Sequence, residues 1–286
     1  MTTRRFTTRS GHVLVADTYG ADDAPPVLLT HGGGQTRHAW NRTGERLAEA
    51  GYRVINLDLR GHGESDWSKA GDYSLDGFIA DVEDVLAQIT TGPIALVGAS
   101  LGGMISLVAT GEAAAHTTRL VLVDVVPRVE PAGAQRIVDF MLAHSDGFAS
   151  LEEAADAVAA YIPERPRPKS NAGLEKNLRL RDGRLHWHWD PALLGPGGLR
   201  GSNAEVRLEL AAATVSCPTL LVRGVLSDVV SPEGVERLRV LIPHLDICDV
   251  AEAGHMVAGD RNDVFASAVV DFLSAPCPQA APHAGR

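Results

Sequence analysis

A single serine, Ser100, lies within the glycine-rich stretch VGASLGGM, which begins at the end of the apolar run IALV. Glycine costs folding entropy and adds no side chain to a core, so this many glycines indicate a sharp turn or a close approach of another group. The run IALV, the turn GASLG and the segment GMISLVAT read as strand, turn and helix. Such a turn brings Gly98 and Gly102 together and pushes the serine hydroxyl out of the sheet in a strained conformation.

The surroundings of Ser100 favour a nucleophile over a phosphate site. The helix that follows directs its N-terminal dipole and free amides at the hydroxyl. A turn that binds a phosphate or a dinucleotide is the alternative, but its G-x-G-x-x-G register is absent. We therefore expect the hydroxyl to attack a carbonyl carbon or a similar centre.

A serine hydroxyl needs a base, and the base needs an orienting acid. His255, in EAGHMVAGD, follows the last predicted strand, and Asp228, in VRGVLSDVV, follows the strand PTLLVRG. Open parallel sheets place active sites at the carboxyl ends of their strands, and the order serine, acid, histidine is the one expected with this turn. The sequence predicts Ser100, Asp228 and His255 as the catalytic residues. Asp124, at the end of RLVLVD, is the rival acid, or it caps a turn or lines the pocket.

The reaction also needs donors for a developing oxyanion. The stretch THGGGQ follows the predicted strand 25–31, and its glycines allow backbone N–H groups to face the site. We predict that the amides of Gly33 and Leu101 form the oxyanion hole. A flexible glycine turn without a role is the alternative.

Further residues are predicted to line the substrate pocket: Gly34, His38, Trp40, Met104, Trp187 and Trp189. Met104 and Met141 are also ordinary core candidates. His186 and His188 alternate in HWHWD (residues 186–190) and could bind a metal, but no second pair of ligands lies nearby, so no metal site is predicted.

Short runs rich in Val, Ile and Leu are typical of strands that are covered on both faces. They span residues 25–31, 52–58, 93–99, 119–124, 218–224 and 245–250. Helical patterns cover residues 74–90, 101–114, 232–241 and 261–273. This alternation predicts a mostly parallel, eight-stranded α/β sheet that is flanked by helices. The segments RRFTTRS and HVLVADTYG predict an antiparallel hairpin at its edge.

The alternation stops after Asp124. Residues 127–213 show helical stretches and proline-rich joints without a strand run, so we expect a helical cap inserted into a core of residues 1–126 and 214–274. Residues 275–286 are rich in Pro and Ala and are expected to form a frayed tail.

Charge and cysteine content exclude several classes of protein. The 286 residues carry a formal charge of −10, and their basic residues are scattered, which disfavours nucleic acid or an anionic membrane as a partner. The three cysteines lack C-x-x-C spacing and fit reduced thiols in a cytoplasmic protein. The N-terminus has no apolar core of a signal peptide, and no run reaches the ~18 residues of a membrane span.

These motifs together resemble the capped branch of the α/β-hydrolase superfamily, from PPVLLTHGGG through DLRGHGESD and GASLGG to GHMVAGD. DLRGHGES is similar to a turn in epoxide hydrolases, cofactor-free haloperoxidases and carbon–carbon bond hydrolases, which implies a structural role for His62. Epoxide hydrolases and haloalkane dehalogenases have an aspartate in place of Ser100, so the resemblance does not extend to an alkyl-enzyme route. HGGG is also found in hormone-sensitive-lipase-type esterases, whose GDSAG turn and N-terminal cap this chain lacks.

The resemblance and the predicted triad imply a serine hydrolase. It would cleave a carboxylic ester or lactone of a small organic substrate through an acyl-enzyme, without a metal or organic cofactor. Three alternatives stay open: a carbon–carbon bond hydrolase, a haloperoxidase that makes peracids, and a ligand-binding homologue with little turnover. The partner is a small molecule, and a homodimer is left open.

Overall fold

The computed structural model describes residues 1–113, 115–163, 171–195, 204–255 and 262–276. Its centre is one eight-stranded sheet in the order β1-β2-β4-β3-β5-β6-β9-β10, in which β1, β2 and β4 pair antiparallel and all later pairs are parallel. The strands are β1 (Thr2–Thr7), β2 (Val13–Tyr19), β3 (Pro26–Thr30), β4 (Arg53–Leu57), β5 (Ile94–Ala99), β6 (Thr117–Val123), β9 (Thr219–Gly224) and β10 (Leu245–Val250). The predicted sheet and its N-terminal hairpin are confirmed.

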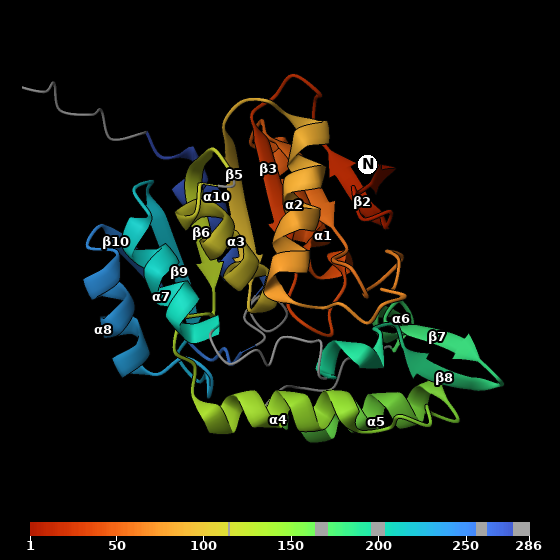
Figure 1. Ribbon diagram of the computed structural model, residues 1–286. Helices are drawn as coiled ribbons and strands as arrows, with labels where there is room; N and C mark the ends of the chain where they lie inside the picture. The colour runs from red at the N-terminus through yellow and green to blue at the C-terminus, as the bar shows by residue number, and fades with distance from the viewer. Residues whose placement is uncertain (114, 164–170, 196–203, 256–261, 277–286) are drawn as a thin grey trace, which may run out of the picture.

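Helices cover both faces of this sheet (Figure 1). On one side lie α2 (Leu75–Ile89), α3 (Leu101–Gly111), α7 (Ala204–Thr214) and α8 (Pro232–Leu241), and on the other side lie α1 (Asn41–Glu49) and α10 (Asn262–Ser274). Alternate residues of β3 supply the two cores, because successive side chains of a strand point to opposite faces. Leu28 packs on the α2 and α3 side, whereas Val27 and Leu29 pack with Phe265 of α10.

The register of the central strands determines where the loops emerge. Thr30 pairs with Gly98, Ala99 pairs with Val123, and Val123 pairs with Val222. The residues that follow β3, β5, β6 and β9 therefore leave the sheet side by side at one edge, as expected for parallel strands.

A layer of shorter elements lies across this carboxyl edge (Figure 1). We call Pro131–Leu194 the cap layer; its elements are α4 (Pro131–Leu142), α5 (Leu151–Tyr161), α6 (Ala172–Glu175), β7 (Leu178–Arg181), β8 (Arg184–Trp187) and the 3-10 turn η2 (Pro191–Leu194). The sequence analysis expected a helical cap. The structure differs in this layer, because β7 and β8 form an antiparallel hairpin. Most of the predicted tail lies outside the described residues.

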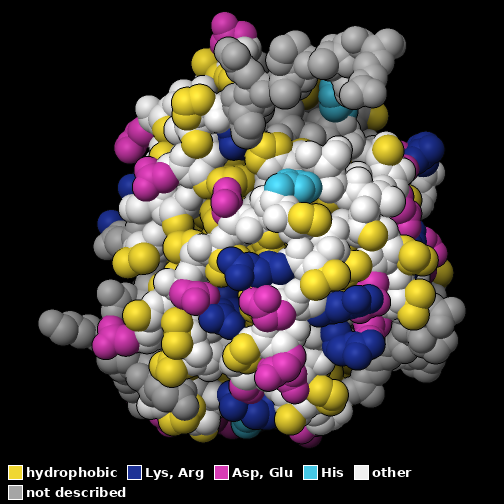
Figure 2. Space-filling view, turned by 90° about the vertical axis from the view of Figure 1, so that its left-hand side faces the viewer, with side chains coloured by type: hydrophobic (Ala, Val, Ile, Leu, Met, Phe, Trp, Pro, Cys, Tyr) yellow, Lys and Arg dark blue, Asp and Glu magenta, His cyan; other side chains and the backbone are white. Residues whose placement is uncertain are grey.

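The predicted cap boundary at residue 213 also differs from the structure, because α7 packs beside α3 in the core. The hydroxyl of Thr214 donates to the Gly111 carbonyl, and Arg207 pairs with Glu112 at 2.7 Å and Asp76 at 2.5 Å. Figure 2 shows the face on the α7 and α8 side, where basic and acidic side chains lie next to each other. Among the described residues, no helix is long and apolar enough to cross a bilayer.

Candidate active site

The strand-to-helix turn at Ser100 has the geometry that the glycines predict. Ser100 has φ 47° and ψ −113°, a conformation that non-glycine residues rarely adopt. A β-carbon on Gly98 would overlap the backbone of Gly102, and one on Gly102 would overlap the carbonyl of Thr30. The turn is therefore possible only with glycine at both positions. The amide of Ser100 donates to the Val123 carbonyl at 3.0 Å, which ties the turn to the end of β6.

The acid that contacts His255 is Asp124. Nδ1 of His255 lies 2.8 Å from Oδ2 of Asp124, whose side chain is 1% exposed. The same carboxylate accepts hydrogen bonds from the Gly224 amide at 3.1 Å and from the Ser227 hydroxyl at 2.5 Å. Asp124 has φ 47°, so the residues that follow β5 and β6 both turn sharply out of neighbouring strands. The buried carboxylate is thus held by three donors, one of them the imidazole.

The prediction that Asp228 orients His255 is wrong. The Asp228 carboxylate lies 3.1 Å from the guanidinium of Arg136 on α4. The loop after β9 runs directly beneath α4, where the Glu130 amide donates to the Val229 carbonyl at 2.9 Å and a β-carbon on Gly133 would overlap the Asp228 carbonyl. This loop therefore brings Ser227 to the buried carboxylate and leaves Asp228 as a partner of the cap layer.

In the loop after β3, residues 31–35, some backbone amides are hydrogen-bonded within the protein and others are left for a ligand. The Gly32 amide donates to Oε1 of Gln35 at 3.0 Å, and the Gly34 amide donates to Nε2 of His62 at 3.1 Å. The amides of Gly33 and Leu101 make no hydrogen bond within the described residues. The two predicted oxyanion donors are therefore available to a ligand.

His31 orients the Gly33 amide. Nδ1 of His31 donates to the Gly32 carbonyl at 2.8 Å, and its Nε2 accepts from the Leu59 amide at 3.0 Å, which fixes this tautomer. Because C=O and N–H of a trans peptide point in opposite directions, holding the Gly32 carbonyl turns the Gly33 N–H away from His31. The His31 carbonyl also accepts from the Gly102 amide at 3.1 Å, which links this loop to the serine turn.

His31 and His62 are both completely buried and uncharged at neutral pH. Burial lowers the pKa of His31 to about 4 and the pKa of His62 to about 3. Their ring centroids lie 4.9 Å apart, and Nδ1 of His62 donates to the Arg60 carbonyl at 2.9 Å. His62 thus has a structural contact with the loop after β3, as the resemblance implied.

The predicted pocket residues do not all lie at the site. A β-carbon on Gly34 would lie 3.3 Å from Met141 and 3.5 Å from Trp189, so the cap layer contacts the loop after β3 there. Trp189 stacks on Trp187 with centroids 4.9 Å apart. Trp40 is wrong as a pocket residue, because it is buried on the α10 side, 5.4 Å from the Phe265 ring. Met141, which the sequence suggested only for the core, belongs to this contact.

Two other predicted pocket residues, Met104 and His38, are half-buried in helical turns. Met104 is half-buried in the first turn of α3 and packs against the core, and its amide donates to the Ser100 carbonyl. His38 is half-buried in the 3-10 turn η1 (Arg37–Trp40), and burial lowers its pKa. Neither has a contact that assigns it to the site.

The two histidines of HWHWD lie against different parts of the structure. Nδ1 of His188 accepts from the Gly63 amide at 2.8 Å, whereas His186 lies against Gly147. No group of three or more His, Cys, Asp or Glu that could hold a metal is found in the described part of the chain.

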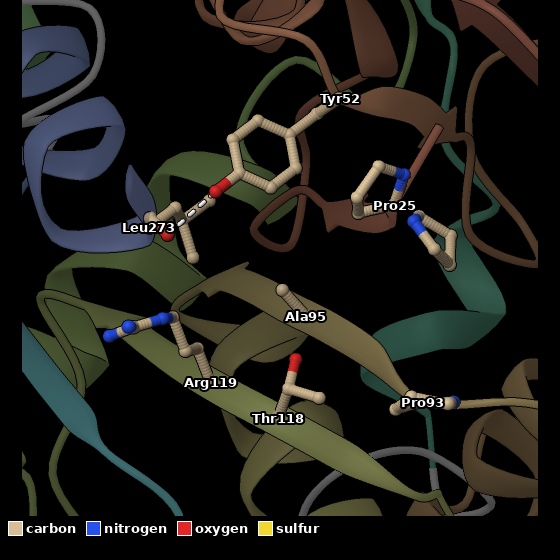
Figure 3. Close-up of a pocket in the computed structure, with 8 residues that line it drawn as sticks. Pro25, Tyr52, Pro93, Ala95, Thr118, Arg119 and Leu273 are labelled. Carbon is tan, nitrogen blue, oxygen red and sulfur yellow. Dashed lines mark hydrogen bonds between the residues drawn. The ribbon is translucent and has the colours of Figure 1, made fainter. Parts of the chain in front are cut away.

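A separate hollow lies at the opposite edge of the sheet (Figure 3). It encloses about 230 Å³ between Pro25, Tyr52, Pro93 and Arg119, near the amino ends of the parallel strands. The Tyr52 hydroxyl donates to the Leu273 carbonyl at 2.6 Å beside it. Its position at the amino ends separates it from Ser100.

The buried histidines predict a loss of stability in acid. Their pKa values lie below the ordinary ~6.5, so below that pH the unfolded chain binds protons that the folded chain does not. The contribution of these neutral histidines to the free energy of unfolding should be fully present above pH ~6.5. It should fall towards pH 4 by up to ~1.4 kcal/mol per pH unit for each histidine. Urea unfolding at several pH values measures this slope. In His62→Gln, which keeps an acceptor for Gly34 but does not titrate, the slope should be smaller; an unchanged slope would contradict the assignment.

Sequence and structure comparisons agree with this architecture. Residues 25–261 match the model of the alpha/beta hydrolase fold family. The chain is 31% identical over 245 residues to "Esterase Rv0045c" of Mycobacterium tuberculosis, covering 83% of this chain and 79% of the relative. It is 27% identical over 260 residues to "3-hydroxybutyrate-oligomer hydrolase" of Cupriavidus necator, covering 85% of this chain and 87% of the relative.

A solved structure shows the same fold. The crystal structure of "E-2-(Acetamidomethylene)succinate Hydrolase" superposes with a TM-score of 0.83 over 96% of this chain and 99% of the other, at 24% identity. The family match spans far more than half of the sequence. The chain therefore belongs to the alpha/beta hydrolase fold family.

Proposed function

We propose that the protein hydrolyses a carboxylic ester or lactone of a small organic substrate with Ser100, His255 and Asp124 as its triad. The observation that carries the proposal is the bond of His255 to the buried Asp124, directly beside the strained turn of Ser100. Asp124 and Ser100 end neighbouring parallel strands, so the imidazole is held by its Nδ1 at the edge where the serine lies. Its Nε2 is the nitrogen left for the serine proton.

The reaction would follow four steps. Ser100 Oγ forms a bond to the carbonyl carbon while its proton moves to Nε2 of His255, and Asp124 stabilises the resulting imidazolium. The carbonyl oxygen becomes an oxyanion that the Gly33 and Leu101 amides bind. The C–O bond to the alcohol breaks as His255 returns the proton to the leaving oxygen. Water then gives a proton to His255 as its oxygen bonds to the acyl carbon. The bond from this carbon to Ser100 Oγ breaks, and His255 returns the proton to Oγ, which releases the acid and regenerates the serine.

The ester class is supported by the relatives and by the apolar cover over the loop after β3. The relative with 31% identity is an esterase by name. Met141 and Trp189 contact Gly34 next to the proposed oxyanion donor, and Trp187 and Trp189 are 7% and 4% exposed. Such a cover suits an apolar acyl or alkyl group rather than a charged one.

A fluorophosphonate probe tests the nucleophile. The probe should form one covalent adduct per chain, because a hydroxyl beside a base and two free amides attacks phosphorus as it attacks a carbonyl. Peptide mapping by mass spectrometry should place the adduct on Ser100. Ser100→Ala is the control and should show neither labelling nor turnover of 4-nitrophenyl esters. An adduct on another residue of active protein would refute the assignment.

The two aspartates provide a matched pair for the acid. Asp124→Asn should lower kcat by roughly 10²- to 10⁴-fold, because an amide can stabilise neither the required tautomer nor the imidazolium. Asp228→Asn removes an ion pair with Arg136 at the surface and should leave kcat within about threefold, since such pairs contribute ~1 kcal/mol or less. Steady-state kinetics of both variants decides between them. The reverse ranking would restore Asp228 as the acid.

A further inference from the structure

The motif HWHWD connects the cap layer by hydrogen bonds to the loop that follows β4. The Gly63 amide donates to Nδ1 of His188 at 2.8 Å, and the Asp190 amide donates to the Gly61 carbonyl at 2.9 Å. The Tyr73 hydroxyl donates to Oδ2 of Asp190 at 2.5 Å. Three hydrogen bonds therefore join residues 188–190 to the segment 61–73.

The same segment holds the loop that carries the proposed oxyanion donor. His62 lies between Gly61 and Gly63, and its Nε2 accepts from the Gly34 amide. The rings of His62 and His188 lie 6.0 Å apart, and Trp189 contacts Gly34 from the cap layer. Gly34 is thus hydrogen-bonded to His62 of the core and lies against Trp189 of the cap layer, the residue that follows His188.

His188 has an unused donor at this position. Its side chain is 1% exposed, and because Nδ1 accepts a hydrogen bond, the proton of the neutral ring lies on Nε2. Nε2 is buried and makes no hydrogen bond of normal geometry, although the backbone of Gly34 lies close enough to be a weak partner of the ring. Burial lowers the pKa of His188 well below its ordinary value, so the ring is neutral. A buried N–H without a well-formed hydrogen bond is unfavourable, so gaining an acceptor would stabilise it.

We propose that His188 is a positioning residue: its Nε2–H donates fully to the Gly34 carbonyl when the oxyanion of the transition state forms at the Gly33 amide. His62 holds the amide of Gly34 and His188 would hold its carbonyl, so Gly33–Gly34 would be fixed from both sides. The proposal rests on the proposed function, because it assigns His188 to the Gly33 oxyanion donor. It makes one side chain of the cap layer part of the hydrolytic site.

Two substitutions distinguish the roles of the two ring nitrogens of His188. Asparagine places an oxygen near Nδ1 and keeps the acceptor for Gly63, whereas glutamine places an N–H near Nε2 and keeps the donor for Gly34. His188→Asn should lower kcat about threefold to tenfold with little change in KM, as expected for one lost hydrogen bond made only in the transition state. His188→Gln should retain more of kcat than His188→Asn. The opposite ranking, or no loss in either variant, would overturn the proposal.

Two controls distinguish positioning from general loosening of the cap layer. Tyr73→Phe removes a bond of the same docking contact without touching Gly34, and His186→Gln changes the neighbouring histidine of the motif. Tyr73→Phe should lower the melting temperature and leave kcat unchanged, and His186→Gln should change neither. If Tyr73→Phe lowers kcat as much as His188→Asn does, the effect is docking alone and the proposal is wrong.

The inhibition constant of a transition-state analogue measures oxyanion binding independently of the stability of the protein. A trifluoromethyl ketone forms a tetrahedral oxyanion on a serine, so its inhibition constant should weaken in His188→Asn by the same factor as kcat/KM. Binding that is unchanged while kcat falls would overturn the proposal. Fluorophosphonate labelling of the wild type distinguishes a failure of the proposed function from a failure of the role of His188. If no adduct forms on Ser100, the proposed function is wrong. If the adduct forms and His188→Asn has normal kcat and inhibitor binding, only the role of His188 is wrong.

Discussion

The whole arrangement depends on the close approach of β5 and α3 at the serine turn. Gly98, Gly102 and the Thr30 carbonyl lie so close together that a β-carbon on either glycine would overlap backbone atoms. This contact forces Ser100 to φ 47° and directs the chain out of the sheet. Because the Gly102 amide also donates to the His31 carbonyl, the turn and the loop after β3 are set against each other by backbone contacts alone. A strained residue of this kind persists only where its surroundings hold it.

Beside Ser100, electrostatics is arranged around the buried carboxylate of Asp124 and several uncharged rings. The Asp124 carboxylate accepts hydrogen bonds from Gly224, Ser227 and His255, so its burial leaves neither oxygen without a donor. His31 and His62 are kept neutral by burial and act through fixed tautomers, which lets them hold the backbone of the loop after β3 without adding charge to the site. A neutral scaffold leaves the amides of Gly33 and Leu101 as the donors that face a developing anion.

The sequence was sufficient for the strands and the serine turn because their signals are local. Buried parallel strands are nearly continuous in apolar residues, and the glycines around Ser100 mark the turn. The choice between Asp124 and Asp228 was not local, since both follow parallel strands. Only the three-dimensional path of the loop after β9 brings Ser227 to the Asp124 carboxylate and leaves Asp228 beside Arg136. Helix α1 was missed because its sequence NRTGERLAE is mostly polar. Trp40 was misplaced because a tryptophan packs equally well in a pocket or on the far side of a sheet.

The most direct test of the central claim is to trap the acyl group on the serine during turnover. A 4-nitrophenyl ester with a bulky acyl group, such as a pivalate, slows deacylation more than acylation. The protein is mixed with this ester, quenched in acid and mapped by mass spectrometry. We expect the mass of the acyl group on the peptide that contains Ser100, appearing as 4-nitrophenol is released. Sustained turnover with no acyl group on Ser100, or with the group on a different residue, would contradict the account.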